Sequence, residues 1–171
     1  LSGNGNDCAP GVAPTWTAAN GWSFDGATQW LDTGVVPDYD WTFLIQFSDV
    51  IGSLGWLLVA SGGAVPRLIA IRPWGISSSV TYWNGTSGAL RAPYLLAGNL
   101  GMAGRDLYRN GAADGAALGA ATSELVTGTM AIGSIGGLSG FIQCKVKAFG
   151  MWDSTLTSAQ VATRAALMAA L

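Results

Sequence analysis

The chain of 171 residues contains no histidine and a single glutamate, Glu124. Histidine is the usual general base near neutral pH and the commonest metal ligand. A catalytic arrangement of Ser, His and Asp, or of Cys and His, is therefore impossible. Retaining glycosidases need two carboxylates about 5 Å apart, and the acids that alternate, Asp38 and Asp40, fall in the loop-like segment PDYD. These absences predict that the chain is not an enzyme.

Charged residues are also scarce, at 11% of the chain, and the net charge is -2. The eight basic residues are scattered, whereas nucleic acids and anionic membrane surfaces attract clustered Lys and Arg. One long apolar run, residues 50–71, is interrupted by Gly62-Gly63, Pro66 and Arg67. This run predicts two buried strands joined by a turn. We therefore expect no nucleic-acid partner and no membrane insertion.

The chain has two cysteines, Cys8 and Cys144, far apart in sequence. Their spacing is not a metal-binding pattern, and they are either one disulfide or two unrelated thiols. Cys144 alternates with Ile142 and Val146, so a buried thiol is the simpler interpretation. A Cys8–Cys144 disulfide would tie the N-terminus to the last strand.

Glycine is abundant, with 25 residues, and eight tryptophans accompany it in a chain that is half apolar. Short apolar runs separated by glycine-rich turns are typical of an all-β domain. Residues 1–20 are rich in Gly, Pro and Asn, which predicts an irregular N-terminal segment before a single β-sandwich domain over residues 21–171. Strands are expected at 41–48, 56–61, 67–72, 77–83, 106–109, 128–132 and 141–149, and a hairpin that turns at Asp25-Gly26 over residues 22–33.

The end of the chain predicts a strand followed by a helix. Ile142, Cys144, Val146 and Ala148 share one face, while Gln143, Lys145 and Lys147 share the other. This alternation is typical of an antiparallel strand with one buried face. Thr157 and Gln160 have the spacing of a capping box, which predicts where the helix begins. Trp152 is expected to pack beneath the turn between this strand and the helix.

Several segments together resemble the concanavalin A-like superfamily, in particular laminin G-like domains. They are FDGATQWLDTG (24–34), WTFLIQFS (41–48), LYRNG (107–111) and AIGSIGG…GFIQCKVKAFGMWDSTLTSAQV from Ala131. The resemblance covers residues 22–163 and implies a jelly-roll sandwich of two antiparallel sheets with a short C-terminal helix. The chain departs from the family in lacking a Trp/His-rich strand before its second Asn-Gly turn, and its helix is longer.

Aromatic residues in loops and on sheet faces are the candidates for ligand contact, because sugar rings stack their C–H faces on them. Trp74 lies in the loop-like segment RPWG. Tyr82 and Trp83 are adjacent, so in a strand one of them faces outward. Trp56 and Tyr94 are weaker candidates. Each Trp taken singly is more often packed in a core, and we assign Trp30 and Trp41 there.

Calcium is a further expectation of the resemblance, since laminin G-like domains often hold it at a sandwich edge. The nearest acidic cluster is Asp32, Asp38 and Asp40, and carboxylates suit Ca²⁺. The alternative, which we favour, is that Asp32 and Asp38 stabilise turns. Asn84-Gly85-Thr86 is a glycosylation sequon, although Asn-Gly is also a common turn.

The sequence as a whole predicts a non-catalytic recognition or adhesion module, most simply for glycans. Its expected location is extracellular or on a virion surface, as part of a larger protein. The alternative is an architectural role, in which the domain decorates or assembles a viral capsid or tail and contacts neighbouring protein subunits in place of a sugar. The positive mean hydropathy of +0.37 favours close contacts with neighbours.

Overall fold

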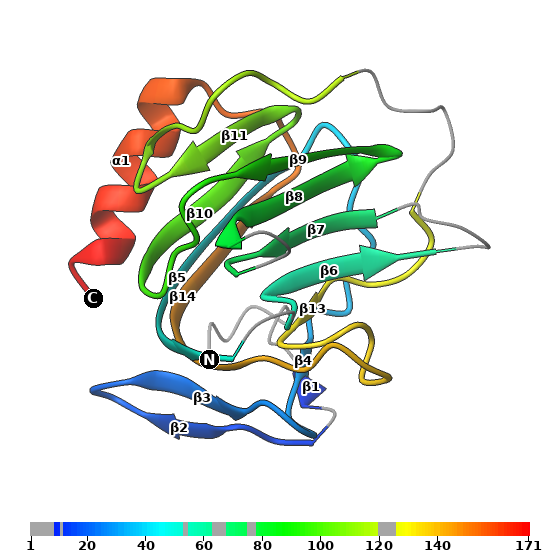
Figure 1. Cartoon of the computed structure of the whole chain (residues 1–171), viewed down its shortest axis with the longest axis vertical. Helices are drawn as coiled ribbons and strands as arrows, with labels where there is room; N and C mark the ends of the chain where they lie inside the picture. The colour runs from blue at the N-terminus through cyan, green and yellow to red at the C-terminus, as the bar shows by residue number, and fades with distance from the viewer. Residues whose placement is uncertain (1–8, 11, 53–54, 63–67, 75–77, 120–125) are drawn as a thin grey trace.

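The computed structural model describes residues 9–10, 12–52, 55–62, 68–74, 78–119 and 126–171. Their strands form two antiparallel sheets stacked face to face, with one helix, α1 (Ser158–Ala169), beside them (Figure 1). The predicted all-β jelly-roll sandwich with a short C-terminal helix is confirmed. No helix in the described part of the chain is long and apolar enough to cross a membrane.

Sheet A has seven described strands in the spatial order β1 (Ala9–Pro10), β4 (Leu31–Asp32), β13 (Ala131–Ile132), β6 (Leu58–Ser61), β7 (Leu68–Arg72), β8 (Val80–Gly85) and β9 (Ser87–Arg91). Sheet B has the order β12 (Ala112–Ala113), β11 (Asp106–Arg109), β10 (Gly98–Ala103), β5 (Thr42–Ile51), β14 (Gln143–Trp152), β3 (Gly21–Asp25) and β2 (Thr15–Thr17). The strands β1 and β2 lie inside the segment that was expected to be irregular.

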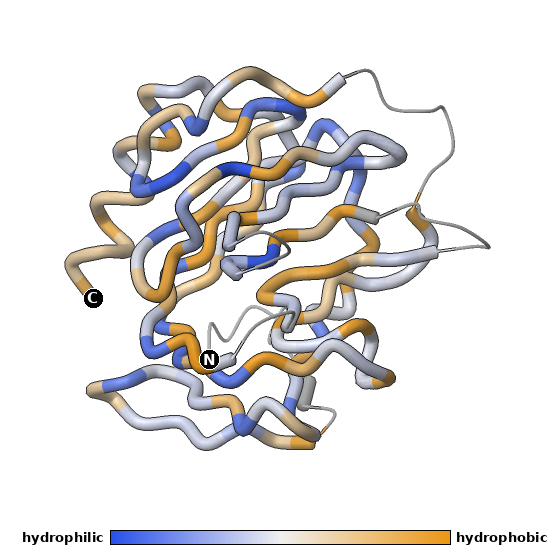
Figure 2. The backbone as a smooth tube through the Cα atoms, in the orientation of Figure 1, coloured by the Kyte–Doolittle hydropathy of each residue, from blue (hydrophilic) through white to orange (hydrophobic). Residues whose placement is uncertain are grey.

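The core between the sheets follows from the alternation of apolar residues along the strands. In β5, Phe43, Ile45 and Phe47 point inward and are fully buried. They meet Leu58, Ile69, Ile71 and Tyr82 of sheet A in one cluster. Figure 2 shows apolar stretches running along the central strands of both sheets. The burial of these side chains is the main stabilising contribution to the sandwich.

The closing strand β14 alternates as predicted only in its first half. Cys144 and Val146 are buried in the core, but a bulge lies between Val146 and Ala148, where two residues oppose one on β5. A bulge of this kind shifts the alternation by one position. Phe149 and Met151 therefore pack against the core, and the prediction that Ala148 shares the inward face is wrong.

The hairpin predicted at Asp25-Gly26 is also wrong. The strand before this turn, β3, belongs to sheet B, whereas β4 after it belongs to sheet A. The Asp25 carboxylate accepts hydrogen bonds from the backbone N–H groups of Ala27, Thr28 and Gln29, at 2.9 to 3.0 Å, and from the Thr28 hydroxyl at 2.7 Å. This cage of donors bends the chain from one sheet to the other.

The helix α1 covers the outer face of sheet B and begins at the predicted cap. Thr157 Oγ1 accepts from Gln160 N at 3.4 Å, and Gln160 Oε1 accepts from Thr157 N at 2.9 Å. Val161 is buried in a cluster with Leu44, Ala103 and Tyr108 of the sheet. Trp152 joins this cluster, as predicted.

Two tryptophans assigned to the core pack against different hydrophobic clusters. Trp41 is half-buried against the main core. Trp30 is half-buried against a second hydrophobic cluster, of Trp56, Val59 and Ala131. Val59 and Ala131 point outward because their neighbours Leu58 and Ile132 fill the core.

Replacing Asp25 by Asn tests the crossover turn. The hydrogen bonds, above all the one from Thr28 N–H, hold the pKa of Asp25 well below its ordinary value. Their stabilising effect is present above the unfolded pKa of about 3.9 and is lost as pH falls toward the lower pKa of the folded state. Asp25→Asn is expected to lower the free energy of unfolding at neutral pH by on the order of 1 kcal/mol.

The measurement is urea denaturation of both proteins at about pH 7 and about pH 3. The stability of Asp25→Asn should fall less between these values than that of the unaltered chain. Asp153→Asn, which alters an exposed aspartate elsewhere on the surface, is the control. Equal pH dependence in the Asp25→Asn protein and the unaltered chain would contradict this role.

Candidate ligand-binding site

The outer face of sheet A carries most of the candidate residues. Because Ile69, Ile71, Val80 and Tyr82 point into the core, the residues between them point outward. Arg72 on β7 is the direct cross-strand neighbour of Thr81 on β8, and Thr81 is that of Leu90 on β9. In the next row, Ala70 faces Trp83, which faces Gly88.

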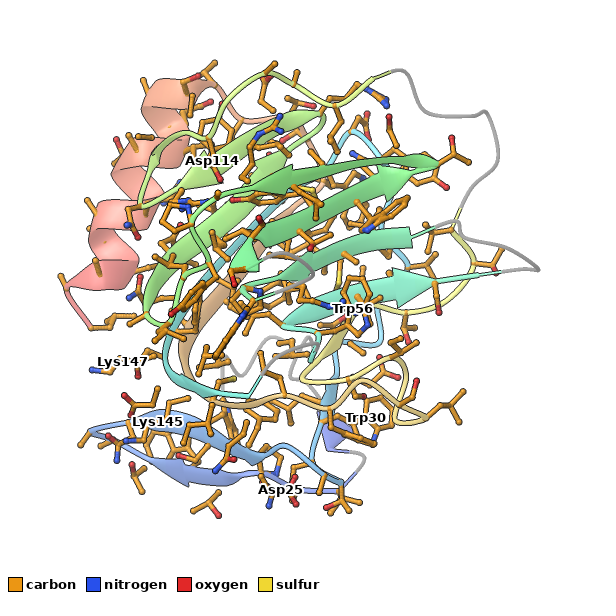
Figure 3. All side chains as sticks on the ribbon, in the orientation of Figure 1. Asp25, Trp30, Trp56, Asp114, Lys145 and Lys147 are labelled. Carbon is orange, nitrogen blue, oxygen red and sulfur yellow. The ribbon has the colours of Figure 1, made fainter. Side chains whose placement is uncertain are left out.

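These rows form a groove of about 400 Å³, and its lining residues are Trp56, Arg72, Thr81, Trp83, Gly88, Ala89 and Leu90. Two of the predicted candidates, Trp56 and Trp83, lie in this groove together. They come from positions 27 residues apart in sequence and are joined by the pairing of β6, β7 and β8. Figure 3 shows Trp56 next to β6.

Glycines seat both indoles. A Cβ at Gly88 would lie 2.9 Å from two ring carbons of Trp83, so the absence of a side chain lets the indole lie against β9. A Cβ at Gly140 would likewise meet the ring of Trp56. The backbone oxygen of Gly140 accepts a hydrogen bond from the backbone N–H of Trp56 at 2.8 Å. Such close approaches to backbone hold each ring in one place.

Arg72 supplies the charge of the groove. Its guanidinium lies 3.9 Å from the centre of the Trp56 ring, in a cation–π contact. Within the described part of the chain, no carboxylate pairs with Arg72 and its buried Nε has no hydrogen-bond partner. Burial lowers the pKa of Arg72 from its ordinary value. The pKa of an arginine nevertheless lies so far above 7 that the side chain remains charged at neutral pH.

The Thr81 hydroxyl beside Arg72 is also buried without a partner in the described structure. Unpaired buried polar atoms are rare in folded proteins, and each calls for a physical explanation. Here two of them, from cross-strand neighbours, meet in one groove with two indoles. The arrangement offers cationic donors, a hydroxyl and aromatic walls to a small ligand.

Tyr82 lies outside this groove because it points into the core. It is fully buried, and its hydroxyl lies 2.9 Å from Asp114 Oδ2 and 3.1 Å from the backbone oxygen of Tyr108, both acceptors. Burial, followed by the negative charge of Asp114, raises the pKa of Tyr82. Arg109 completes this network with an ion pair of 3.1 Å to Asp114, beside β11 (Figure 3). Tyr82 therefore fastens the two sheets to each other and is out of reach of a surface ligand.

Trp74, the first sequence candidate, lies outside the residues that line the groove. It is half-buried and stacks on Tyr94, with ring centres 4.6 Å apart and planes 13° from parallel. The two rings cover each other in the loops that follow β7 and β9. The face that each ring turns toward the other is closed to a ligand.

The three acidic candidates for calcium serve local turns or stand alone. Asp32 accepts from the N–H of Gly34 at 2.9 Å, and Asp38 from that of Tyr39 at 2.6 Å. Among the described residues, no group of three Asp, Glu, Cys or His side chains has the geometry of a metal site. Asp40 is therefore not brought into a cluster with the other two.

Two further sequence candidates concern covalent modification. Cys144 is buried in the core, whereas Cys8 lies outside the described residues, so the disulfide stays a prediction. Asn84 of the sequon is fully buried, and its amide donates to the backbone oxygens of Tyr39 and Gly104. The side chain of Asn84 is thus inaccessible to glycosylation in the folded chain.

Sequence reasoning missed Arg72, Thr81, Gly88 and Leu90 as site residues. The signal was present, because the alternation in LIAIR and VTYW places Arg72, Thr81 and Trp83 outward together once the apolar residues are placed inward. The pairing of β7 with β8, which brings them side by side, is set by tertiary structure.

No family model and no curated protein matches the chain, but solved structures do. Trypanosoma rangeli sialidase in complex with the inhibitor DANA matches at a TM-score of 0.62 and 16% identity, over 91% of this chain and 29% of the sialidase chain. Its complex with 2,3-difluorosialic acid matches at a TM-score of 0.66 and 14% identity, over the same shares. The native heptameric SAP-like pentraxin from Limulus polyphemus matches at 0.59 and 16%, over 94% of this chain and 82% of its own.

At these identities the likeness shows the fold. It supports the concanavalin A-like sandwich, while the narrower laminin G-like assignment stays a prediction. The chain spans less than a third of the length of the sialidase chains.

The matches correct the prediction that the chain is not an enzyme. The same sandwich occurs within the chains of a sialidase, which is an enzyme. The absence of histidine and of a carboxylate pair therefore does not exclude this chain from an enzyme. A fold shared with an enzyme leaves the reaction itself to be decided by the site.

A double-mutant cycle between Gly88 and Trp83 tests how the groove is built. Gly88→Ala is expected to displace the indole and to lower the free energy of unfolding by about 1–3 kcal/mol. In a Trp83→Ala background the same change should be neutral or stabilising by about 0.4–1 kcal/mol, because alanine restricts the unfolded chain. Urea denaturation of the four proteins measures the coupling; an equal effect of Gly88→Ala in both backgrounds would show that the indole does not lie against residue 88.

Proposed function

We propose that the chain is a carbohydrate-recognition domain whose ligand carries an acidic group. The observation that carries the proposal is the guanidinium of Arg72, which has no carboxylate partner among the described residues and lies over the indole of Trp56 in the groove that Trp83 also lines. The proposed function keeps the glycan partner that the sequence predicts. The positive charge of Arg72 adds the proposal that this glycan is acidic.

The walls of the groove suit a sugar ring. The half-buried indole of Trp83 presents a flat apolar face to the C–H groups of a pyranose, and Leu90, which is 49% exposed, extends the apolar rim. A volume of about 400 Å³ lies at the lower end of the range of roughly 300–1,000 Å³ for small-molecule sites. The groove therefore fits one or two sugar units.

Arg72 selects the charge of the ligand. A guanidinium binds a carboxylate or sulfate through two parallel hydrogen bonds, which are stronger than bonds between neutral groups. The contact with Trp56 fixes the plane of the guanidinium before a ligand arrives, which lowers the entropic cost of binding.

This proposal carries with it the expected location on the outside of a cell or virion, as part of a larger protein. One of the matching sialidase structures is a complex with sialic acid, an acidic sugar. The proposal rests on the groove, because the likeness to that structure concerns the fold.

The test is a glycan array in which each acidic glycan is paired with its neutral counterpart, for example a uronic acid with its methyl ester. Acidic glycans are expected to bind and neutral counterparts to bind at least roughly tenfold more weakly. Arg72→Gln should remove this preference, and Trp83→Ala should weaken binding of both kinds by about tenfold. Raising the salt concentration should weaken the binding of acidic glycans and leave the binding of neutral glycans unchanged.

Tyr82→Phe is the matched control, because Tyr82 neighbours Trp83 in the same strand but points into the core. It should lower stability by about 1 kcal/mol and leave binding unchanged. Binding of no glycan would overturn the proposed function. Equal binding of acidic and neutral partners would overturn the role of Arg72.

A second candidate function is assembly with neighbouring protein subunits, in an extracellular or virion particle. The observation that favours it is Trp16 on β2, at the edge of sheet B. Trp16 is 57% exposed and packs edge-on against Trp22, with ring centres 6.4 Å apart. An exposed edge strand that carries a large apolar side chain is a ready surface for pairing with another chain.

Trp16→Ser tests assembly. If β2 pairs with a second copy, sedimentation of the unaltered chain should show a concentration-dependent oligomer, and Trp16→Ser should shift it to monomer. Leu167→Ser, which removes another exposed apolar side chain on α1, is the control and should leave the oligomer intact. A monomeric unaltered chain at every concentration would contradict self-assembly through β2.

A further inference from the structure

A second groove, of about 390 Å³, lies between α1 and the outer face of sheet B, the sheet opposite the proposed acidic-glycan groove. Its floor is formed by Gln46 of β5 and Asn99 of β10, which are direct cross-strand neighbours. One wall is the turn between β11 and β12, which carries Asn110 and Gly111.

The other wall is a stripe of alanines on α1. Its members, at the spacing of one helical face, are Ala162, Ala165, Ala166 and Ala169. A helix that only covers a sheet gains most from large apolar residues on the face it buries. Here Val161 and Met168 pack onto the sheet, while the alanine stripe leaves space beside them.

The amides on the floor have unused acceptors. Asn99 is 2% exposed, and its Oδ1 has no hydrogen-bond partner in the described structure. Its Nδ2 makes only a weak contact, of 3.6 Å, with the sulfur of Met168. Gln46 Oε1 is likewise buried without a partner among the described residues. Two buried acceptors on adjacent strands thus lie at the floor of the groove, and the described residues supply no donor to either.

We infer that this groove binds a neutral sugar. The two amide oxygens require a ligand with neighbouring hydrogen-bond donors, which adjacent hydroxyls of a pyranose provide. The alanine methyl groups match the C–H face of the same ring. None of the side chains that line this groove is charged, so the site attracts no ionic ligand, in contrast to the groove of Arg72.

The test is a titration of the ¹⁵N-labelled chain with D-glucose, D-galactose, D-mannose and N-acetyl-D-glucosamine, followed through the side-chain amide signals of Gln46 and Asn99. At least one sugar should shift both signals in a saturable manner. Failure of all four to shift them would overturn the inference. Trp83→Ala should leave this titration unchanged, which separates the second groove from the proposed function.

Three variants separate binding from stability. Ala166→Leu fills the groove from a helix that tolerates leucine well and should weaken binding at least roughly tenfold. Ala159→Leu, on the same helix but outside the lining, is the matched control and should bind normally. Gln46→Leu removes an unpaired acceptor, so it should abolish binding while the melting temperature stays constant or rises.

Two results would overturn the inference even if a sugar shifts the signals. Unchanged binding by Ala166→Leu would place the ligand elsewhere. A lower melting temperature for Gln46→Leu would show that its amide oxygen has a structural partner in the folded chain.

Discussion

The register between β7 and β8 is the constraint on which both faces of sheet A depend. Ile71 lies opposite Tyr82, and Arg72 opposite Thr81. A slip by one residue would reverse every side chain and bury Arg72 in the core. The Tyr82 hydroxyl helps to prevent this slip, since it bonds the Tyr108 backbone and the Asp114 carboxylate of the other layer. The packing of the inner face of sheet A thus fixes the arrangement of the groove on its outer face.

Two polar atoms of the groove, Arg72 Nε and Thr81 Oγ1, have no hydrogen-bond partner among the described residues. Lys145 and Arg109, elsewhere in the chain, are held in ion pairs, with Asp49 at 2.7 Å and with Asp114 at 3.1 Å. Arg72 instead lies over Trp56 with no carboxylate beside it in the described structure. Holding the buried Nε of Arg72 without a partner costs stability, and a ligand with an acidic group would recover part of that cost.

Sequence patterns predicted the parts of this molecule that depend on local periodicity. The alternation in WTFLIQFS, the inward Cys144 and Val146, and the Thr157 cap are all found in the structure. The hairpin at Asp25 failed because local turn chemistry does not say which sheet the next strand joins. The alternation of β14 failed at Ala148 because a bulge depends on the partner strand β5.

The same division holds for the candidate site. Trp56 and Trp83 were found as aromatics, but their meeting with Arg72 depends on strand pairing that the sequence alone does not reveal. Tyr82 was wrongly counted among the ligand candidates because an isolated polar group in a strand carries no sign of its partner across the sandwich. The most direct test is the Nε–H NMR signal of Arg72 during titration with an acidic sugar and with its methyl ester. The account predicts a saturable shift with the acid alone; no shift with any acidic sugar, or equal shifts with both forms, would contradict it.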